Sequence, residues 1–168
     1  MKIFLYSSPY KYYRDNLLPL GKRFQELGHD VYMSHSYKKD SSLKNLVETI
    51  DIHGATASSG YVKKFLKGDF NPDVVILTQA WWFLEDSIVK MCNQRNIPFY
   101  ILDHAAPILA YSEKSGKKSH LYRNNTCGAK SHIVWGSNSY QIMKDRGCKS
   151  KMDILGSPRV EEFVSKKS

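Results

Sequence analysis

Residues 73–104 read DVVILTQAWWFLEDSIVKMCNQRNIPFYILDH, and this stretch decides the fold. It opens with a short apolar run and closes with another at 97–102. Between them, apolar side chains recur at helical spacing: Leu84, Ile88, Met91 and Cys92. This order predicts a β-strand, a crossover helix and a parallel second strand. Because loops that leave parallel strands lie at one edge of the sheet, we expect residues 79–82 and 103–107 to meet there and to bind a ligand.

Similar apolar runs recur along the rest of the chain. They predict strands near residues 2, 31, 74, 98, 133 and 153, with helical material between them. The clearest further helix carries apolar residues from Leu17 to Leu27, has Pro19 in its first turn and ends at Gly28. Weaker patterns predict helices over 43–50 and 62–66, a short helix that ends near residue 128, and a helix capped by Ser137 or Asn138.

Together these elements predict an α/β fold. We expect a doubly wound, mostly parallel, Rossmann-like sheet of about six strands with helices on both faces. At 168 residues the chain suits one domain, which we place at residues 1–160. Residues 161–168 form a charged tail or the start of an interdomain linker.

Composition limits the class of protein. The chain is 42% hydrophobic and 24% charged, as in globular proteins. No apolar run approaches the ~20 residues of a membrane span, and Lys2 leads directly into the first strand, which leaves no room for a signal peptide. We therefore expect a cytoplasmic protein. Cys92, Cys127 and Cys148 lack a Cys-x-x-Cys spacing, which predicts free thiols and no metal site.

The formal net charge is +9, and its basic residues come in short, scattered groups. A solvated basic surface is the simpler interpretation. The sharper one is attraction to a polyanionic acceptor or to an anionic membrane surface, with the protein peripheral on the inner face of the membrane. No nucleic-acid-binding motif occurs, so we expect no specific nucleic-acid partner.

Asp103 and His104 are the candidate catalytic residues. A histidine with a pKa near ~6.5 can take a proton from an attacking hydroxyl, and a neighbouring carboxylate can orient it. Adjacent residues of an extended segment point to opposite sides, so Asp103 need not contact His104. A histidine held by a structural hydrogen bond is the competing interpretation.

The loop after the first strand carries candidate ligand-binding residues. Ser7 and Ser8 hydroxyls or the Arg14 guanidinium can hold a phosphate or a sugar, although an ordinary turn explains the serines equally well. No Gly-x-Gly-x-x-Gly follows this strand, so we expect no NAD or FAD.

The other candidate ligand-binding residues are Gln79, Trp81, Trp82 and Arg123. The two tryptophans follow the strand at 74–77, where their rings can stack on the apolar face of a sugar or a base. Packing in the core is the alternative, and we expect one ring buried and the other partly exposed.

Four short motifs resemble the N-terminal half of GT-B glycosyltransferases: ELGHDV at 26–31, PDVVIL at 72–77, WGSN at 135–138 and GSPR at 156–159. The last two resemble especially the branch that makes capsule, teichoic acid and related polysaccharides. The resemblance implies an acceptor-side domain without a cofactor of its own. It also implies that a C-terminal domain or partner subunit binds a nucleotide-activated sugar or glycerol donor. His104 matches the position from which such domains present a base, whereas Ser7 and Ser8 depart from the family's glycine-containing first loop.

Our leading functional prediction is the acceptor-binding half of a glycosyltransferase or glycerophosphotransferase in surface polysaccharide or glycoconjugate synthesis. In this prediction His104 deprotonates a hydroxyl of a carbohydrate or polyanionic acceptor in an inverting transfer. The first alternative is a non-catalytic domain that binds a carbohydrate or phosphorylated ligand. The second is a sugar-nucleotide epimerase-like half-domain.

Overall fold

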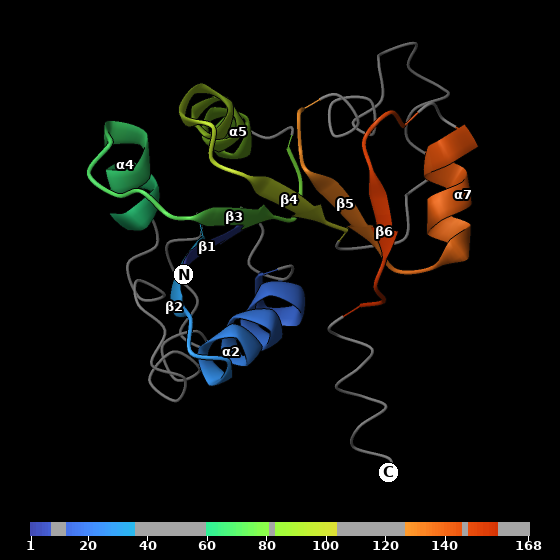
Figure 1. The fold of residues 1–168 in the computed structure, drawn as a ribbon, viewed down its shortest axis with the longest axis horizontal. Coiled ribbons are helices and arrows are strands. Elements are labelled where there is room, and N and C mark those ends of the chain that lie inside the picture. Colours follow the sequence, from blue (N-terminus) through green and yellow to red (C-terminus); the bar gives the residue numbers. More distant parts are fainter. Residues whose placement is uncertain (8–12, 36–59, 81–82, 104–126, 146–147, 158–168) are drawn as a thin grey trace.

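The computed structural model describes residues 1–7, 13–35, 60–80, 83–103, 127–145 and 148–157. Six strands form one sheet in the order β2-β1-β3-β4-β5-β6, and every neighbouring pair is parallel (Figure 1). The predicted α/β fold is thereby confirmed. The strands are β1 (Lys2–Ser7), β2 (Asp30–His35), β3 (Val74–Leu77), β4 (Phe99–Leu102), β5 (Ser131–Val134) and β6 (Met152–Ile154).

Helices cover both faces of the sheet, as predicted. In Figure 1, α2 lies below the sheet, α4 and α5 lie above it, and α7 stands beyond β6. The described helical elements are η1 (Tyr13–Leu17), α2 (Leu18–Glu26), α4 (Gly60–Lys67), α5 (Phe83–Arg95) and α7 (Ser137–Asp145).

The sheet separates two apolar layers, because alternate side chains of a strand point to opposite faces. On one face, Ile3 and Leu5 of β1 pack with Leu17 and Leu18, at the junction of η1 and α2. On the other face, Phe4 and its neighbours pack against α4 and α5; this layer also contains Tyr6, Phe65, Val75, Leu77, Ile88, Cys92, Phe99 and Ile101. β1, β3 and β4 are therefore buried on both sides, as central parallel strands are, whereas the edge strand β6 is only partly covered.

The organising unit forms as the sequence predicts. β3, α5 and β4 follow one another, and β4 pairs beside β3. The helix ends at a left-handed residue, Asn96 with φ of 56°, and the Ile97 amide donates to the Cys92 carbonyl at 2.9 Å. Pro98 follows and cannot continue the helix.

The first predicted helix is confirmed with two differences. Pro19 lies in the first turn of α2, and Gly28 has the left-handed φ of 79° that a C-terminal cap requires. A π-helix, η1, precedes α2, and the apolar periodicity gave no sign of it. Leu27 is exposed and does not belong to the buried face.

Two other helices test the weaker predictions. α4 confirms the helix expected over 62–66. α7 begins at Ser137, and the Tyr140 amide donates to the Gly136 carbonyl at 3.0 Å, so Gly136 and not Ser137 or Asn138 stands at the cap position. The predictions for residues 43–50, for the short helix before residue 128 and for the tail at 161–168 lie outside the described residues. Within the described ranges, no helix combines the length and apolar character of a membrane span.

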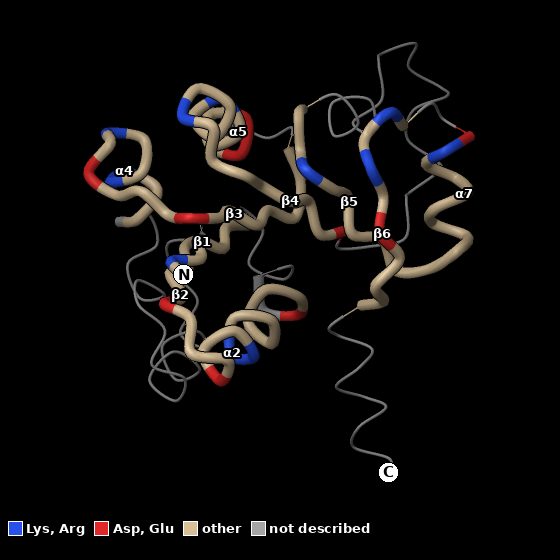
Figure 2. Tube along the Cα trace, in the orientation of Figure 1, with Lys and Arg blue, Asp and Glu red and all other residues tan. Residues whose placement is uncertain are grey.

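Charged side chains are distributed over the whole described structure. Figure 2 shows Lys and Arg on α2, α4, α5 and α7 and in the segments that lead into β5 and β6, interspersed with acidic residues. The described part of the chain therefore does not gather its positive charge on one element.

Candidate functional site

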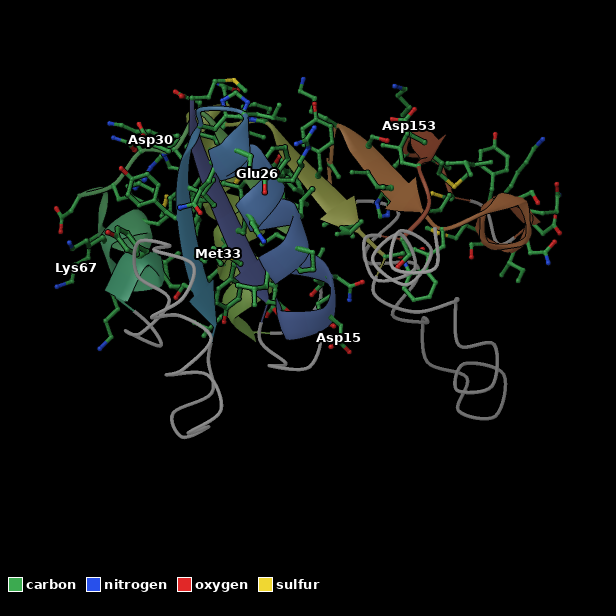
Figure 3. The ribbon with its side chains drawn as sticks, turned by 90° about the horizontal axis from the view of Figure 1, so that it is seen from below. Asp15, Glu26, Asp30, Met33, Lys67 and Asp153 are labelled. Carbon is green, nitrogen blue, oxygen red and sulfur yellow. The ribbon has the colours of Figure 1, made fainter. Side chains whose placement is uncertain are left out.

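The carboxyl edge of the sheet is the candidate site. β1 pairs with β2 on one side and with β3 on the other, so the chain reverses its direction of strand addition between β1 and β3. Ligands of open α/β sheets bind at such a switch point. Figure 3 places Asp15 of η1 at the end of the molecule toward which β2 points, opposite to Glu26 and Asp30. The π-helix therefore lies at the same edge, and π-helical turns recur at functional sites.

Two hydroxyl groups contact each other at the switch point. The Ser7 and Thr78 side-chain oxygens lie 2.7 Å apart, and both residues are buried. They are brought together because Tyr6 and Leu77 are paired residues of β1 and β3, and each is followed by its hydroxyl residue. Ser7 was predicted as a ligand-binding residue, whereas Thr78 was missed. Thr78 could have been identified by extending the β1–β3 strand pairing one residue beyond Tyr6 and Leu77.

Gln79 is held by a second polar contact at this edge. Its Nε2 donates to Glu85 Oε1 at 3.2 Å, and both side chains are buried. Glu85 belongs to the first turn of α5, where a carboxylate interacts favourably with the helix dipole. Gln79 was predicted at this edge, but sequence reasoning missed Glu85, because a glutamate in a first helical turn is usually exposed.

Asp103 follows β4 and differs from the other residues of the edge. The residue is half-buried, but its Oδ2 atom is inaccessible to solvent and has no hydrogen-bond partner among the described residues. Burial raises the pKa of this carboxyl from 3.8 to about 7. The group can therefore both hold and release a proton near neutral pH, which is what general acid–base chemistry requires.

The amide and the carbonyl of Asp103 are both hydrogen-bonded. Its amide donates to the Ile133 carbonyl at 3.0 Å, and its carbonyl accepts the Trp135 indole N–H at 2.6 Å. Trp135, the residue that follows β5, is thus hydrogen-bonded to the end of β4. It was known only as part of a sequence motif, and its contact with Asp103 was not predicted.

The cysteines near this region are protonated. All three are free thiols. Burial raises the pKa of Cys92 to about 12, and burial and the nearby Asp103 carboxyl raise the pKa of Cys148. These described thiols are poor nucleophiles at neutral pH, because the thiolate is the reactive form. Among the described residues, no group of three or more His, Cys, Asp or Glu side chains could hold a metal ion.

The remaining predicted site residues stay predictions. Ser8, Trp81, Trp82, His104 and Arg123 lie outside the described residues, and only the backbone of Arg14, within η1, is described. The structure therefore brings Ser7, Gln79 and Asp103 to one edge of the sheet.

The sequence matches no protein-family model and no curated protein. Solved structures do match. The UDP-GlcNAc 2-epimerase from Neisseria meningitidis, bound to UDP-GlcNAc, has a TM-score of 0.67 and 13% identity over 99% of this chain and 50% of that chain. The S. aureus MnaA–UDP structure has a TM-score of 0.64 and 12% identity over 97% of this chain and 46% of that chain.

A third structure, a putative UDP-N-acetylglucosamine 2-epimerase from Listeria monocytogenes, has a TM-score of 0.65 and 11% identity over 98% of this chain and 47% of that chain. At these identities the similarity shows the fold, a Rossmann-like α/β domain. The chain spans about half the length of the solved structures that it resembles.

Proposed function

We propose that this chain is one half of a two-domain enzyme that acts on a sugar nucleotide, in the manner of an epimerase. Two findings support the proposal. Structures described as UDP-GlcNAc 2-epimerases share its fold and are about twice its length. The carboxyl edge, where such folds bind ligands, carries a buried carboxyl whose pKa is about 7.

Asp103 is the observation that carries the proposal. In the proposed reaction, a proton leaves C2 while its electron pair forms a C1–C2 double bond and expels the nucleotide from C1; addition of a proton to the opposite face of C2 and of the nucleotide to C1 completes the inversion. A carboxyl with a pKa near the working pH serves either step, because neither protonation state dominates. In our proposal the Asp103 side chain transfers a proton at the sugar, and the Ile133 and Trp135 contacts hold its backbone in place.

The test is conversion of UDP-GlcNAc in D2O by the chain together with its second half. We expect the C2 epimer with deuterium at C2, and a loss of about 10²–10⁴-fold in rate for Asp103→Asn. Asp153→Asn is the matched control. Asp153 is also a carboxylate of the sheet, within β6, but its pKa is lowered by hydrogen bonds from Ser131 and Lys151. An Asp103→Asn enzyme with the wild-type rate would refute the assignment.

The acceptor-binding half of a glycosyltransferase is the second candidate, favoured by the four motifs at 26–31, 72–77, 135–138 and 156–159. In this alternative His104 removes a proton from the acceptor hydroxyl, and a donor-binding C-terminal domain or partner subunit completes the enzyme. The same incubation distinguishes the two. Transfer of the sugar to an added acceptor, without deuterium at C2 and with loss of the rate in His104→Ala, would favour the transferase.

A further inference from the structure

Two buried polar side chains bracket the connection between β3 and α5. Gln79 is 1% exposed and Glu85 is 0% exposed, and their contact of 3.2 Å joins the two ends of the segment 80–84. The residue before Gln79 is anchored as well, because Thr78 contacts Ser7. Ala80, which begins the segment, is buried against the layer beneath α4 and α5. The segment is therefore fixed at its start and at its end.

Joining the two ends of a short connection by a buried polar pair costs more free energy than joining them by apolar contact. A carboxylate removed from water loses favourable hydration unless hydrogen bonds and nearby dipoles replace it. An apolar pair of similar size would close the same segment without that loss. The gain from the polar pair is directional, since a hydrogen bond to a carboxylate fixes geometry in a way that apolar contact does not.

We propose that Glu85 is a positioning residue, which acts through Gln79 to fix the β3–α5 connection for a ligand at the switch point. The inference rests on the proposed function, because it requires a ligand at this edge. Loss of either member of the Gln79–Glu85 pair should therefore loosen this segment first and weaken ligand binding as a consequence.

The first experiment is amide hydrogen exchange of the unliganded 168-residue chain, read by mass spectrometry. Gln79→Ala and Glu85→Ala should each speed exchange in the peptide covering 79–86 by about tenfold, and peptides from α2 should be unchanged. Glu85→Gln retains a side-chain oxygen that can accept the Gln79 amide, and exchange should return to within about threefold of wild type.

The control is Gln141→Ala. Gln141 Nε2 donates to Asp145 Oδ1 at 2.7 Å on the exposed surface of α7, so it is the same kind of pair away from the switch point. It should leave exchange at 79–86 unchanged. Unchanged exchange at 79–86 in Gln79→Ala and Glu85→Ala, or an equal rise in the α2 peptides, would overturn the proposal. If Glu85→Ala does not fold, Gln79→Ala decides alone.

The second readout is the dissociation constant for UDP-GlcNAc. It should rise about tenfold in Gln79→Ala and Glu85→Ala at a temperature where both are folded, and it should recover in Glu85→Gln. Variants that bind as tightly as wild type would reduce the pair to a structural contact and overturn the ligand role. If the wild-type chain and its complete enzyme both fail to bind UDP-GlcNAc, the proposed function fails, whereas the exchange experiment still decides whether Glu85 fixes the segment.

Discussion

The two ends of the carboxyl edge differ in how their polar groups are paired. At the switch point, Ser7 contacts Thr78 and Gln79 donates to Glu85. At the end of β4, Asp103 Oδ2 is buried without a partner among the described residues. Buried polar groups that pair with each other stabilise a structure, whereas an unpaired one costs free energy. In the proposed function, the switch point holds the edge in shape and the end of β4 carries the chemistry.

The sharpest test of this comparison is Asp103→Asn. The pKa of Asp103 is about 7 in the folded protein, against 3.8 for the carboxyl of the unfolded chain, so the folded protein binds the proton more tightly. Stability from this group is therefore complete below pH ~4 and is lost as the pH rises through about 7. At pH 8 the variant should have a free energy of unfolding higher than wild type by about 1–4 kcal/mol. Urea unfolding at pH 5 and pH 8 measures it.

Equal pH dependence of the Asp103→Asn variant and wild type between pH 4 and 7 would contradict this prediction. It would mean that folding does not raise the pKa of Asp103 and that its carboxyl does not carry the cost of burial that distinguishes the end of β4 from the switch point.

Thr78→Val should have the opposite sign. It removes one hydroxyl of the 2.7 Å contact with Ser7 while keeping the shape of the side chain. We expect a loss of about 1–3 kcal/mol in the free energy of unfolding, because a buried hydroxyl is left with one partner fewer. The loss should be the same at pH 5 and pH 8, since no group with a shifted pKa takes part. A stabilised variant would remove the contrast with Asp103.

Trp135→Phe tests the backbone hydrogen bond of Asp103 independently of its side-chain carboxyl. The indole N–H donates to the Asp103 carbonyl at 2.6 Å, so its removal should lower the free energy of unfolding by about 1 kcal/mol. The pH dependence assigned to the Asp103 carboxyl should remain, because the lost bond goes to the backbone. Thermal unfolding at the same two pH values checks both statements, and disappearance of the pH dependence would show that Trp135 is needed to keep the carboxyl buried.

The smallest effect is expected for Lys90→Ala. Lys90 Nζ lies 2.7 Å from Asp86 Oδ2, but both side chains are largely exposed. Such pairs contribute about 0.3–0.5 kcal/mol in a helix. The change in urea midpoint should be near the error of the measurement and should vanish in high salt. A larger loss that salt reduces would show that α5 depends on its surface charges as well as on the buried Glu85 contact.

The strands and main helices could be predicted because their signal is local. The apolar runs at Val74–Leu77 and Phe99–Leu102 and the spacing of Leu84 and Ile88 lie within a few residues of each other. The π-helix could not be predicted, since its pattern of side chains resembles that of an ordinary helical turn.

Only the location of the candidate site, at the carboxyl edge of the sheet, could be predicted from the sequence. The order of elements places Ser7, Gln79 and Asp103 together, but the partner of each depends on tertiary packing. Ser7 meets a residue 71 positions away, and Asp103 meets Trp135, 32 positions away. The burial that raises the pKa of Asp103 is likewise a property of the assembled sheet, so no local pattern announces it.

The position of β1 in the middle of the sheet also has a consequence for how the chain folds as it is synthesised. β1 leaves the ribosome before the other described strands, yet its partner β3 ends near residue 77, and the Lys2 amide donates to Asp73 Oδ2 at 2.7 Å. At about 5–20 residues per second, the roughly 71 intervening residues delay this pairing by roughly 4–14 s. Throughout that interval β2 is the one of its two described partner strands with which β1 can pair. Ile3 and Leu5 can already pack against Leu17 and Leu18, whereas Phe4 and Tyr6 still lack their later neighbours in β3, α5 and β4.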